Sequence, residues 1–198
     1  KVSAVNKNVV VVLSAGSSVE MPWADRVAAI VHGYLGGQAG ASAMLDVLTG
    51  ATCPSGKLNE TYAYSLEDVA STSYYPAIER SSEYREGLYM GYRYFDTAGV
   101  KVRFPFGFGL SYTTFAYSDL TVDGGGVTFT ITNTGECDGA EIAQMYVGHE
   151  RSHLFGPKKE LKGFVKVFLK KGESQQVTIP FDDKTFRYYN VKTNGWEV

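Results

Sequence analysis

The feature that most constrains the fold is a change in hydrophobic pattern near residue 110. Before it, apolar residues form unbroken runs such as Val9–Leu13; after it they alternate with polar residues, as Val127, Phe129 and Ile131 do. Unbroken β-branched runs are typical of strands covered on both faces of a parallel sheet, and alternation is typical of half-buried antiparallel strands. A chain of 198 residues has room for two small domains. The sequence therefore predicts an α/β part followed by an all-β part.

Residues 1–78 are predicted to alternate strands and helices. Strands are expected at Val9–Leu13 and Val27–Val31, with a short helix starting near Pro22 between them. A longer helix follows, and a further strand is expected at 57–62, at the edge of the sheet. The longer helix is indicated by apolar residues at helical spacing and by a glycine at its C′ position: Ala41, Met44, Leu45, Leu48 and Gly50.

The glycine-rich segment Gly33–Gly40 precedes this helix and has to be weighed as a phosphate cradle. It lacks the Gly-Lys-Ser/Thr ending of a P-loop and does not match the dinucleotide-binding pattern G-x-G-x-x-G. A turn or packing role is therefore predicted for these glycines. No other segment indicates a cofactor, and none is expected.

Residues 110–198 are predicted to form a β-sandwich, because short alternating strands follow one another at turn-separated intervals. Asp123–Gly126 supplies the turn of the first hairpin. The expected strands cover residues 115–122, 127–132, 140–147, 161–169 and 174–181, with a last one at 196–198. Six lysines between Lys158 and Lys171 are interrupted by Glu160 and are assigned to a solvated face. The net charge of −2 gives no footprint for nucleic acid or a membrane surface.

Residues 79–109 join the two parts and are rich in aromatic side chains. Nine aromatic residues lie between Tyr84 and Tyr112, a third of the 27 in the chain. They would form either a platform that stacks on a sugar or a wedge that buries large areas between domains. Their dense alternation favours the structural wedge, with Arg85, Arg93 and Arg103 pairing with carboxylates across it.

The segment His149–His153 matches the zinc-protease motif H-E-x-x-H. That motif needs a long helix to place both histidines on one face, whereas here a predicted strand ends at Gly148 and Pro157 follows soon after. We therefore assign it to an exposed loop and predict no metal site. His32, within an apolar strand, is expected to be a core residue.

Candidate carboxylates for acid/base work are Glu20, Glu60, Glu83, Glu86 and Asp96. Ion pairs or helix caps are the expected role of each, because no neighbouring sequence predicts a raised pKa. Cys53 and Cys137 fall in different predicted parts and are expected to be free thiols in a reducing compartment. No signal peptide or apolar run of about 20 residues is visible, which favours the cytoplasm over secretion and indicates no membrane partner. Because the chain begins in mid-pattern at Lys1, we expect a piece of a longer protein, for which secretion stays open.

Several segments together identify a resemblance. These are NVVVVLSAGSSVEMPWAD (8–25), GGQAGASAMLDVLTGATCPSGKL (36–58), YREGLYMGYRYFD (84–96), FPFGFGLSYTTF (104–115) and KELKGFVKVFLKKGES (159–174). In this order they resemble the C-terminal region of glycoside hydrolase family 3, the β-glucosidase and β-xylosidase family. The resemblance covers nearly the whole chain.

The resemblance implies a TIM-like barrel with an aspartate nucleophile, an α/β sandwich with a glutamate acid/base, and a fibronectin III-like domain. Residues 1–78 would be the C-terminal part of the α/β sandwich and 110–198 an incomplete fibronectin III-like sandwich. Both catalytic carboxylates would lie outside this segment, and no substrate-binding residue is assigned. The barrel, before or after this segment in the same or a companion chain, would be its partner.

The activity implied is that of a retaining exo-acting β-glycosidase, in the first place a β-glucosidase acting on β-glucosides or oligosaccharides. This segment would support the active site and be inactive alone. The alternative is a non-catalytic module that binds carbohydrate or a partner.

Overall fold

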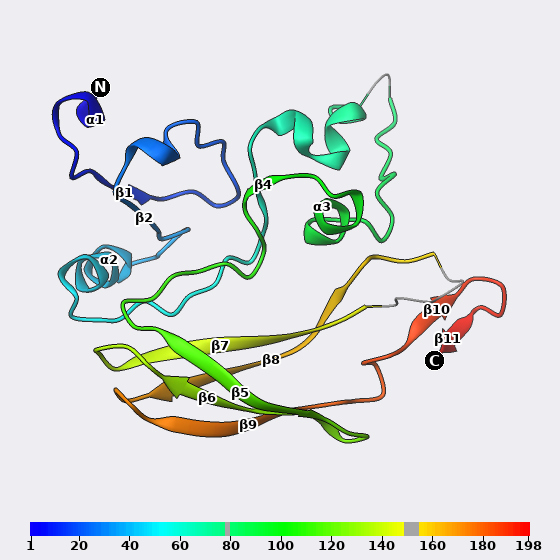
Figure 1. The fold of residues 1–198 in the computed structure, drawn as a ribbon. Helices are drawn as coiled ribbons and strands as arrows, with labels where there is room; N and C mark the ends of the chain where they lie inside the picture. Colours follow the sequence, from blue (N-terminus) through cyan, green and yellow to red (C-terminus); the bar gives the residue numbers. More distant parts are fainter. Residues whose placement is uncertain (78–79, 149–154) are drawn as a thin grey trace. The chain divides into compact units, whose positions relative to one another are not determined.

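The computed structural model describes residues 1–77, 80–148 and 155–198, which divide into two compact units (Figure 1). The first unit comprises residues 1–52 and 57–108, and the second comprises 53–56 and 109–198. Most of the segment predicted as a joint thus belongs to the first unit. The predicted boundary at 78/79 lies outside the described residues. Cys53–Gly56 belongs to the second unit although residues on both sides of it belong to the first.

The first unit begins with the predicted order of strand, short helix, strand and helix. After the short helix α1 (Val2–Val5), strand β1 (Val10–Leu13) pairs in parallel with β2 (Ala29–His32). The 3-10 helix η1 (Ala24–Arg26) lies between them, and α2 (Gly40–Thr49) follows. Helix α2 ends at Gly50, whose φ of 78° is a left-handed conformation that glycine adopts without a steric penalty.

Burial of the parallel strands differs from the expectation. The side chains alternate between exposed and half-buried along β1, and Val10 and Val12 are both 47% exposed. On α2, Met44 is half-buried whereas Leu45 and Leu48 are exposed. The prediction that β1 is covered on both faces is therefore wrong for the described residues, because they supply cover for one face only.

The strand expected at 57–62 is also different in extent and partner. Strand β3 covers only Tyr62–Ala63 and pairs antiparallel with β4 (Val102–Phe104) instead of joining the parallel sheet. The ladder stops at β4 because Pro105, the next residue, has no N–H to donate. Beyond it, Leu58 donates to the Phe108 carbonyl and accepts from the Gly107 N–H, both at 2.8 Å.

Four short helices in the first unit were not predicted. They are α1, η2 (Leu66–Asp68), η3 (Ala70–Ser73) and α3 (Tyr92–Ala98). Helix η2 begins with a capping box, in which the Ser65 and Asp68 side chains each bond the other residue's backbone N–H. Helix α3 is seven residues long and ends at Gly99 with φ 66°.

The second unit is a β-sandwich with the predicted strand order. One antiparallel sheet contains β5 (Phe115–Val122), β6 (Gly126–Asn133) and β9 (Ser174–Pro180), and the other pairs β7 (Gly139–Val147) with β8 (Glu160–Leu169). The strands predicted at 115–122, 127–132, 140–147, 161–169 and 174–181 are thus confirmed to within one residue at each end. Strand β10 (Tyr188–Asn190), which pairs with β11 (Gly195–Glu197), was not predicted.

The core of the sandwich consists of inward-facing residues from β6, β7, β8 and β9. Along β8 the expected alternation is confirmed: Val167 and Leu169 are buried, whereas Phe164, Lys166 and Phe168 are exposed. The eight buried members are Phe129, Ile131, Ala143, Met145, Val167, Leu169, Val177 and Ile179. In the part of the chain that the structure describes, no helix has the length and apolar composition of a membrane span.

Candidate functional site

Ligands of open α/β sheets bind at the carboxyl ends of the parallel strands, which here lie at the end of the β1–β2 pair. There His32 lies beside Tyr34 and Tyr62, at centroid distances of 3.8 Å and 5.6 Å. The His32 Nδ1 lies 3.1 Å from the Leu13 carbonyl oxygen, to which it donates as an N–H in one tautomer. In that tautomer Nε2 accepts from the Tyr62 hydroxyl.

The electrostatics of this histidine cluster favour neutral groups. Burial raises the pKa of Tyr62 well above its usual range, and the neighbouring Tyr34 and the charge of Glu60 add to the effect. The phenol thus stays a neutral donor, and both nitrogens of His32 are paired, as expected for a structural core residue. The cluster can orient the loop after β2, and both nitrogens of its histidine are occupied by these contacts.

The glycines of Gly33–Gly40 serve packing and a turn, as predicted. A Cβ on Gly33 would lie 3.0 Å from the Met44 sulfur, and one on Gly36 would lie 2.8 Å from the Gly40 Cα. Gly37 has a φ of 61°, which side-chain-bearing residues rarely adopt. The segment lets α2 approach the sheet closely.

The five candidate carboxylates have different environments. Glu20 accepts the Leu66 backbone N–H at 2.6 Å, at the start of η2. Glu83 forms an ion pair with Arg85, whose hydrogen bond and charge lower the pKa of the carboxyl group. These two roles are the ion pair and helix-end contact that the sequence favoured.

The other three candidates are Glu60, Glu86 and Asp96. Glu60 is half-buried near Tyr62, and Asp96 lies on α3. One carboxylate oxygen of Glu86, Oε2, is shielded from solvent without a hydrogen-bond partner. Each belongs to a different segment, and no described contact joins two of these carboxylates.

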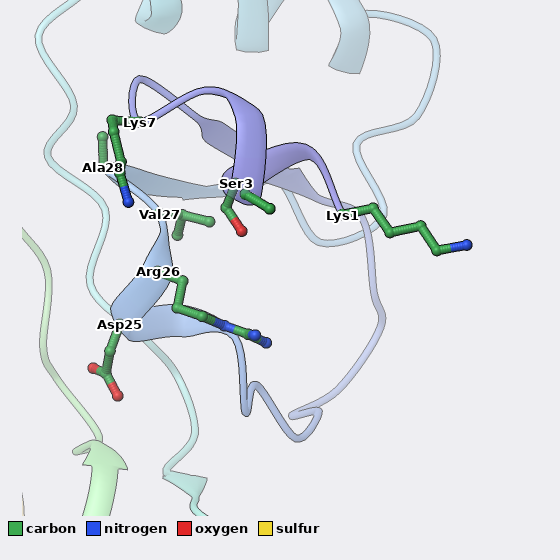
Figure 2. A pocket seen from close by; sticks show the side chains of 8 residues that line it. Lys1, Ser3, Lys7, Asp25, Arg26, Val27 and Ala28 are labelled. Atoms are coloured by element: carbon green, nitrogen blue, oxygen red, sulfur yellow. The ribbon is translucent and has the colours of Figure 1, made fainter.

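A shallow pocket of about 450 Å³ lies between α1 and η1 (Figure 2). Asp25, the one acidic side chain among its described lining residues, is 80% exposed and forms an ion pair with Arg103 at 2.6 Å. Figure 2 shows the Asp25 carboxylate and the Lys1 ammonium pointing away from one another. The pocket therefore lacks the pair of carboxyl groups that glycoside hydrolysis requires.

The aromatic residues from Tyr84 to Phe108 mostly contact one another within the first unit. The Tyr92 and Phe106 rings stack with their centroids 4.7 Å apart, and those of Phe104 and Phe108 stack at 5.3 Å. Phe95 is 6% exposed. These contacts support a structural role over a row of free rings for a sugar. Arg85 and Arg103 have carboxylate partners, as expected. Arg93 lies over the Tyr92 ring.

Two expectations concern metal binding and cysteines. The H-E-x-x-H motif of His149–His153 lies outside the described residues. Among the described ones, no three histidine, cysteine, aspartate or glutamate side chains gather closely enough to hold a metal ion.

Cys53 and Cys137, which the sequence pattern placed in different parts, both lie in the second unit. The positions of the two cysteines in the sequence do not predict that they share a unit.

Known proteins are similar to this chain over its whole length. A thermostable beta-glucosidase B from Acetivibrio thermocellus is 47% identical over 205 residues, which span 100% of this chain and 27% of the relative. An exo-alpha-(1->6)-L-arabinopyranosidase from Bifidobacterium breve is 45% identical over 204 residues, with the same two coverages. The crystal structure of a beta-glucosidase from Streptomyces venezuelae in complex with D-glucose superposes with a TM-score of 0.93 and 38% identity, over 99% of this chain and 26% of that one.

The chain thus spans about a quarter of the length of the curated relatives it matches. Residues 141–198 match the fibronectin type III-like domain, in agreement with the sandwich of the second unit. Residues 1–112, more than half of the chain, match the glycosyl hydrolase family 3 C-terminal domain. Together with the α/β unit and the sandwich, this match shows that the chain belongs to glycosyl hydrolase family 3.

Proposed function

We propose that this chain is part of a retaining, exo-acting β-glycosidase of the β-glucosidase type, and that it supports the active site without supplying its catalytic carboxylates. The observation that carries the proposal is the match of the entire chain to about a quarter of a beta-glucosidase. The same coverage means that most of such an enzyme, including its barrel, would be contributed by other residues.

The chemistry explains why the described residues are insufficient. Retaining hydrolysis uses two carboxyl groups about 5–5.5 Å apart, one as nucleophile and the other as acid and then base. Glu20 and Glu83 have structural partners, Asp25 is paired with Arg103, and no described contact joins any two of the candidate carboxylates. The nucleophilic aspartate and the acid/base glutamate are therefore proposed to lie in the barrel and in the rest of the α/β sandwich.

The part proposed for this chain is positioning. A displacement of about 1 Å in a catalytic group can cost about 100-fold in rate, so a domain that holds the acid/base region in place contributes to catalysis. The contacts proposed for that role are the pairing of β1 with β2, the hydrogen bonds of His32 and the close approach of α2 at Gly33.

The sugar proposed for the whole enzyme is a terminal β-linked glucose. A beta-glucosidase and an arabinopyranosidase are 47% and 45% identical to this chain over its full length. Two enzymes named for different sugars are thus almost equally similar to it, and we propose that this segment does not select the sugar. A terminal β-linked glucose is proposed because beta-glucosidases recur among both the relatives and the solved structures.

The test compares the chain alone with the chain joined to the remaining three-quarters of the protein. With 4-nitrophenyl β-D-glucopyranoside, we expect hydrolysis by the longer protein and none above background by residues 1–198. Proton NMR of the first sugar released should show the β-anomer, as retention requires. Turnover by residues 1–198 alone, or an α-anomer as first product, would refute the proposal.

A second candidate function is a non-catalytic carbohydrate-binding module. The observation that favours it is the pair Phe164 and Phe168, which are 68% and 62% exposed on the outer face of β8. Calorimetric titration of the chain with cello-oligosaccharides distinguishes the two, with F164A/F168A as the matched variant. Saturable binding lost in that variant would support the module; no heat of binding would exclude it for these ligands.

A further inference from the structure

The two cysteines of the chain lie together in the second unit. Cys53 opens the four-residue segment Cys53–Gly56, which follows α2 and is assigned to the sandwich unit. Cys137 lies in the connection between β6 and β7, two residues before β7 begins at Gly139. Both are half-buried free thiols in this structure.

Contacts place the Cys53 sulfur against the start of β7. Its Sγ lies 3.1 Å from the Ser111 hydroxyl. A Cβ added to Gly139 would lie 3.2 Å from the same sulfur, so the absence of a side chain at that position makes room for the thiol. Cys137 lies two residues before Gly139, and burial and the nearby Cys53 thiol raise the pKa of the Cys137 thiol. The two side chains are therefore neighbours although 84 positions separate the residues in the sequence.

The backbone around Cys137 is held firmly. The buried Asn133 side chain donates to the Cys137 carbonyl at 2.9 Å and to the Leu169 carbonyl at 3.0 Å. Its Oδ1 accepts the Thr113 hydroxyl at 2.6 Å. A fixed backbone on one side and a fixed thiol on the other favour a defined geometry for a bond between the two sulfurs.

We propose that Cys53 and Cys137 are an intramolecular disulfide site, closed by oxidised low-molecular-weight thiols and opened by their reduced forms. In closure, one cysteine thiolate attacks the S–S bond of a disulfide such as oxidised glutathione, which releases one glutathione and leaves a mixed disulfide. The second cysteine then attacks the protein sulfur of that mixed disulfide and releases the second glutathione. Two protein thiols are oxidised, one small disulfide is reduced, and the two thiol protons end on the released glutathiones.

The environment sets the rate of this exchange. Burial raises the pKa of the Cys137 thiol, and the neighbouring Cys53 raises it further. Because the thiolate is the attacking species, closure is expected to be slow at neutral pH and faster at pH 9. The bond would close a loop from residue 53 to residue 137 and so restrict the unfolded chain.

The test treats the full chain with oxidised glutathione at pH 9, blocks the remaining thiols with iodoacetamide, and digests it with trypsin without reduction. The expected product joins peptides 27–57 and 104–151, each of which contains one cysteine. Its mass should be that of the two peptides less two hydrogens, and dithiothreitol should separate them. The oxidised chain should also melt several degrees higher than the reduced chain.

The control is Cys53→Ser, which keeps a hydroxyl near Ser111 and removes the bond. This variant should show glutathione attached to Cys137 and no rise in melting temperature on oxidation. Three results would overturn the proposal: two carboxamidomethyl cysteines in the treated wild-type chain, glutathione on both, or a cross-link found only between two chains. The mass measurement on the wild-type chain decides the question even where the variant fails to fold.

Discussion

Replacement of the buried Asn133 tests how the sandwich is held together at its β6–β7 end. The side chain is fully buried and makes four hydrogen bonds. Its amide donates to two carbonyls, and its oxygen accepts the Thr113 hydroxyl and the Gly135 N–H. It thus joins both ends of the β6–β7 connection to β8 and to the segment before β5.

The magnitude follows from these bonds. At roughly 0.5–1.5 kcal/mol of net stability per bond, and more where a buried partner is left unpaired, Asn133→Ala should lower the free energy of unfolding by about 3–4 kcal/mol. Asn133→Asp has nearly the same shape but turns a second oxygen toward the Cys137 and Leu169 carbonyls. We expect it to be at least as destabilising as alanine, because two attractive contacts become repulsive.

Urea unfolding followed by far-UV circular dichroism measures both variants, and hydrogen exchange assigns the transition to the second unit. The matched control is Thr134→Ala at the next residue, whose exposed hydroxyl lies 3.0 Å from that of the exposed Thr114. It should change the free energy by less than about 0.5 kcal/mol. An Asn133→Ala value within about 1 kcal/mol of wild type, at an unchanged m-value, would refute the reasoning.

Three further predictions follow from packing, ionisation and burial. Gly163→Ala should cost about 1–3 kcal/mol in urea unfolding, because its Cβ would lie 2.5 Å from a methyl group of Ile179; Gly124→Ala, with nothing within 4 Å, is its control. Because the pKa of Tyr62 is raised in the folded state, its contribution to stability should be constant below about pH 10 and fall above it, by up to about 1.4 kcal/mol per pH unit. Tyr62→Phe should flatten that fall, and an equal fall in the variant would contradict the assignment. In native-state hydrogen exchange, the amides of β6–β9 should outlast those of β1–β2, since the core cluster lies on the former; equal protection would contradict this.

The elements that the sequence predicted are those with a local signal. Alternation in 127–132 and 161–169 was sufficient for β6 and β8, and the apolar spacing before Gly50 was sufficient for α2. The order of strands in the sandwich followed from turns such as Asp123–Gly126. In each case the residues that determine the element lie within it or directly beside it.

The features that were missed depend on distant residues. Strand β3 pairs with β4, with Tyr62 opposite Phe104. The pairing is short because Pro105 follows β4, and that proline lies far from residue 62 in the sequence. The contact of Cys53 with the β6–β7 connection requires the chain to enter the second unit for only four residues. Prediction of the candidate site was limited in another way. The family resemblance, and not any pattern in the residues, implied that the catalytic carboxylates lie outside this segment, so the residues present indicate family and fold but not chemistry.

The uneven burial in the two units gives a physical reason for the proposed inactivity of the chain alone. Eight of the described buried residues form one cluster in the sandwich, whereas the buried apolar residues of the first unit are Met21, Tyr62 and Phe95. Val10 and Val12 on β1, and Leu45 and Leu48 on α2, are exposed there. In the longer enzyme proposed here, we expect further α/β sandwich to cover these residues. The isolated chain would then lack both the carboxylates and the cover that fixes the parallel strands. Mixing with the barrel alone should therefore restore little activity, and only a partner that also covers β1 and α2 should restore it fully.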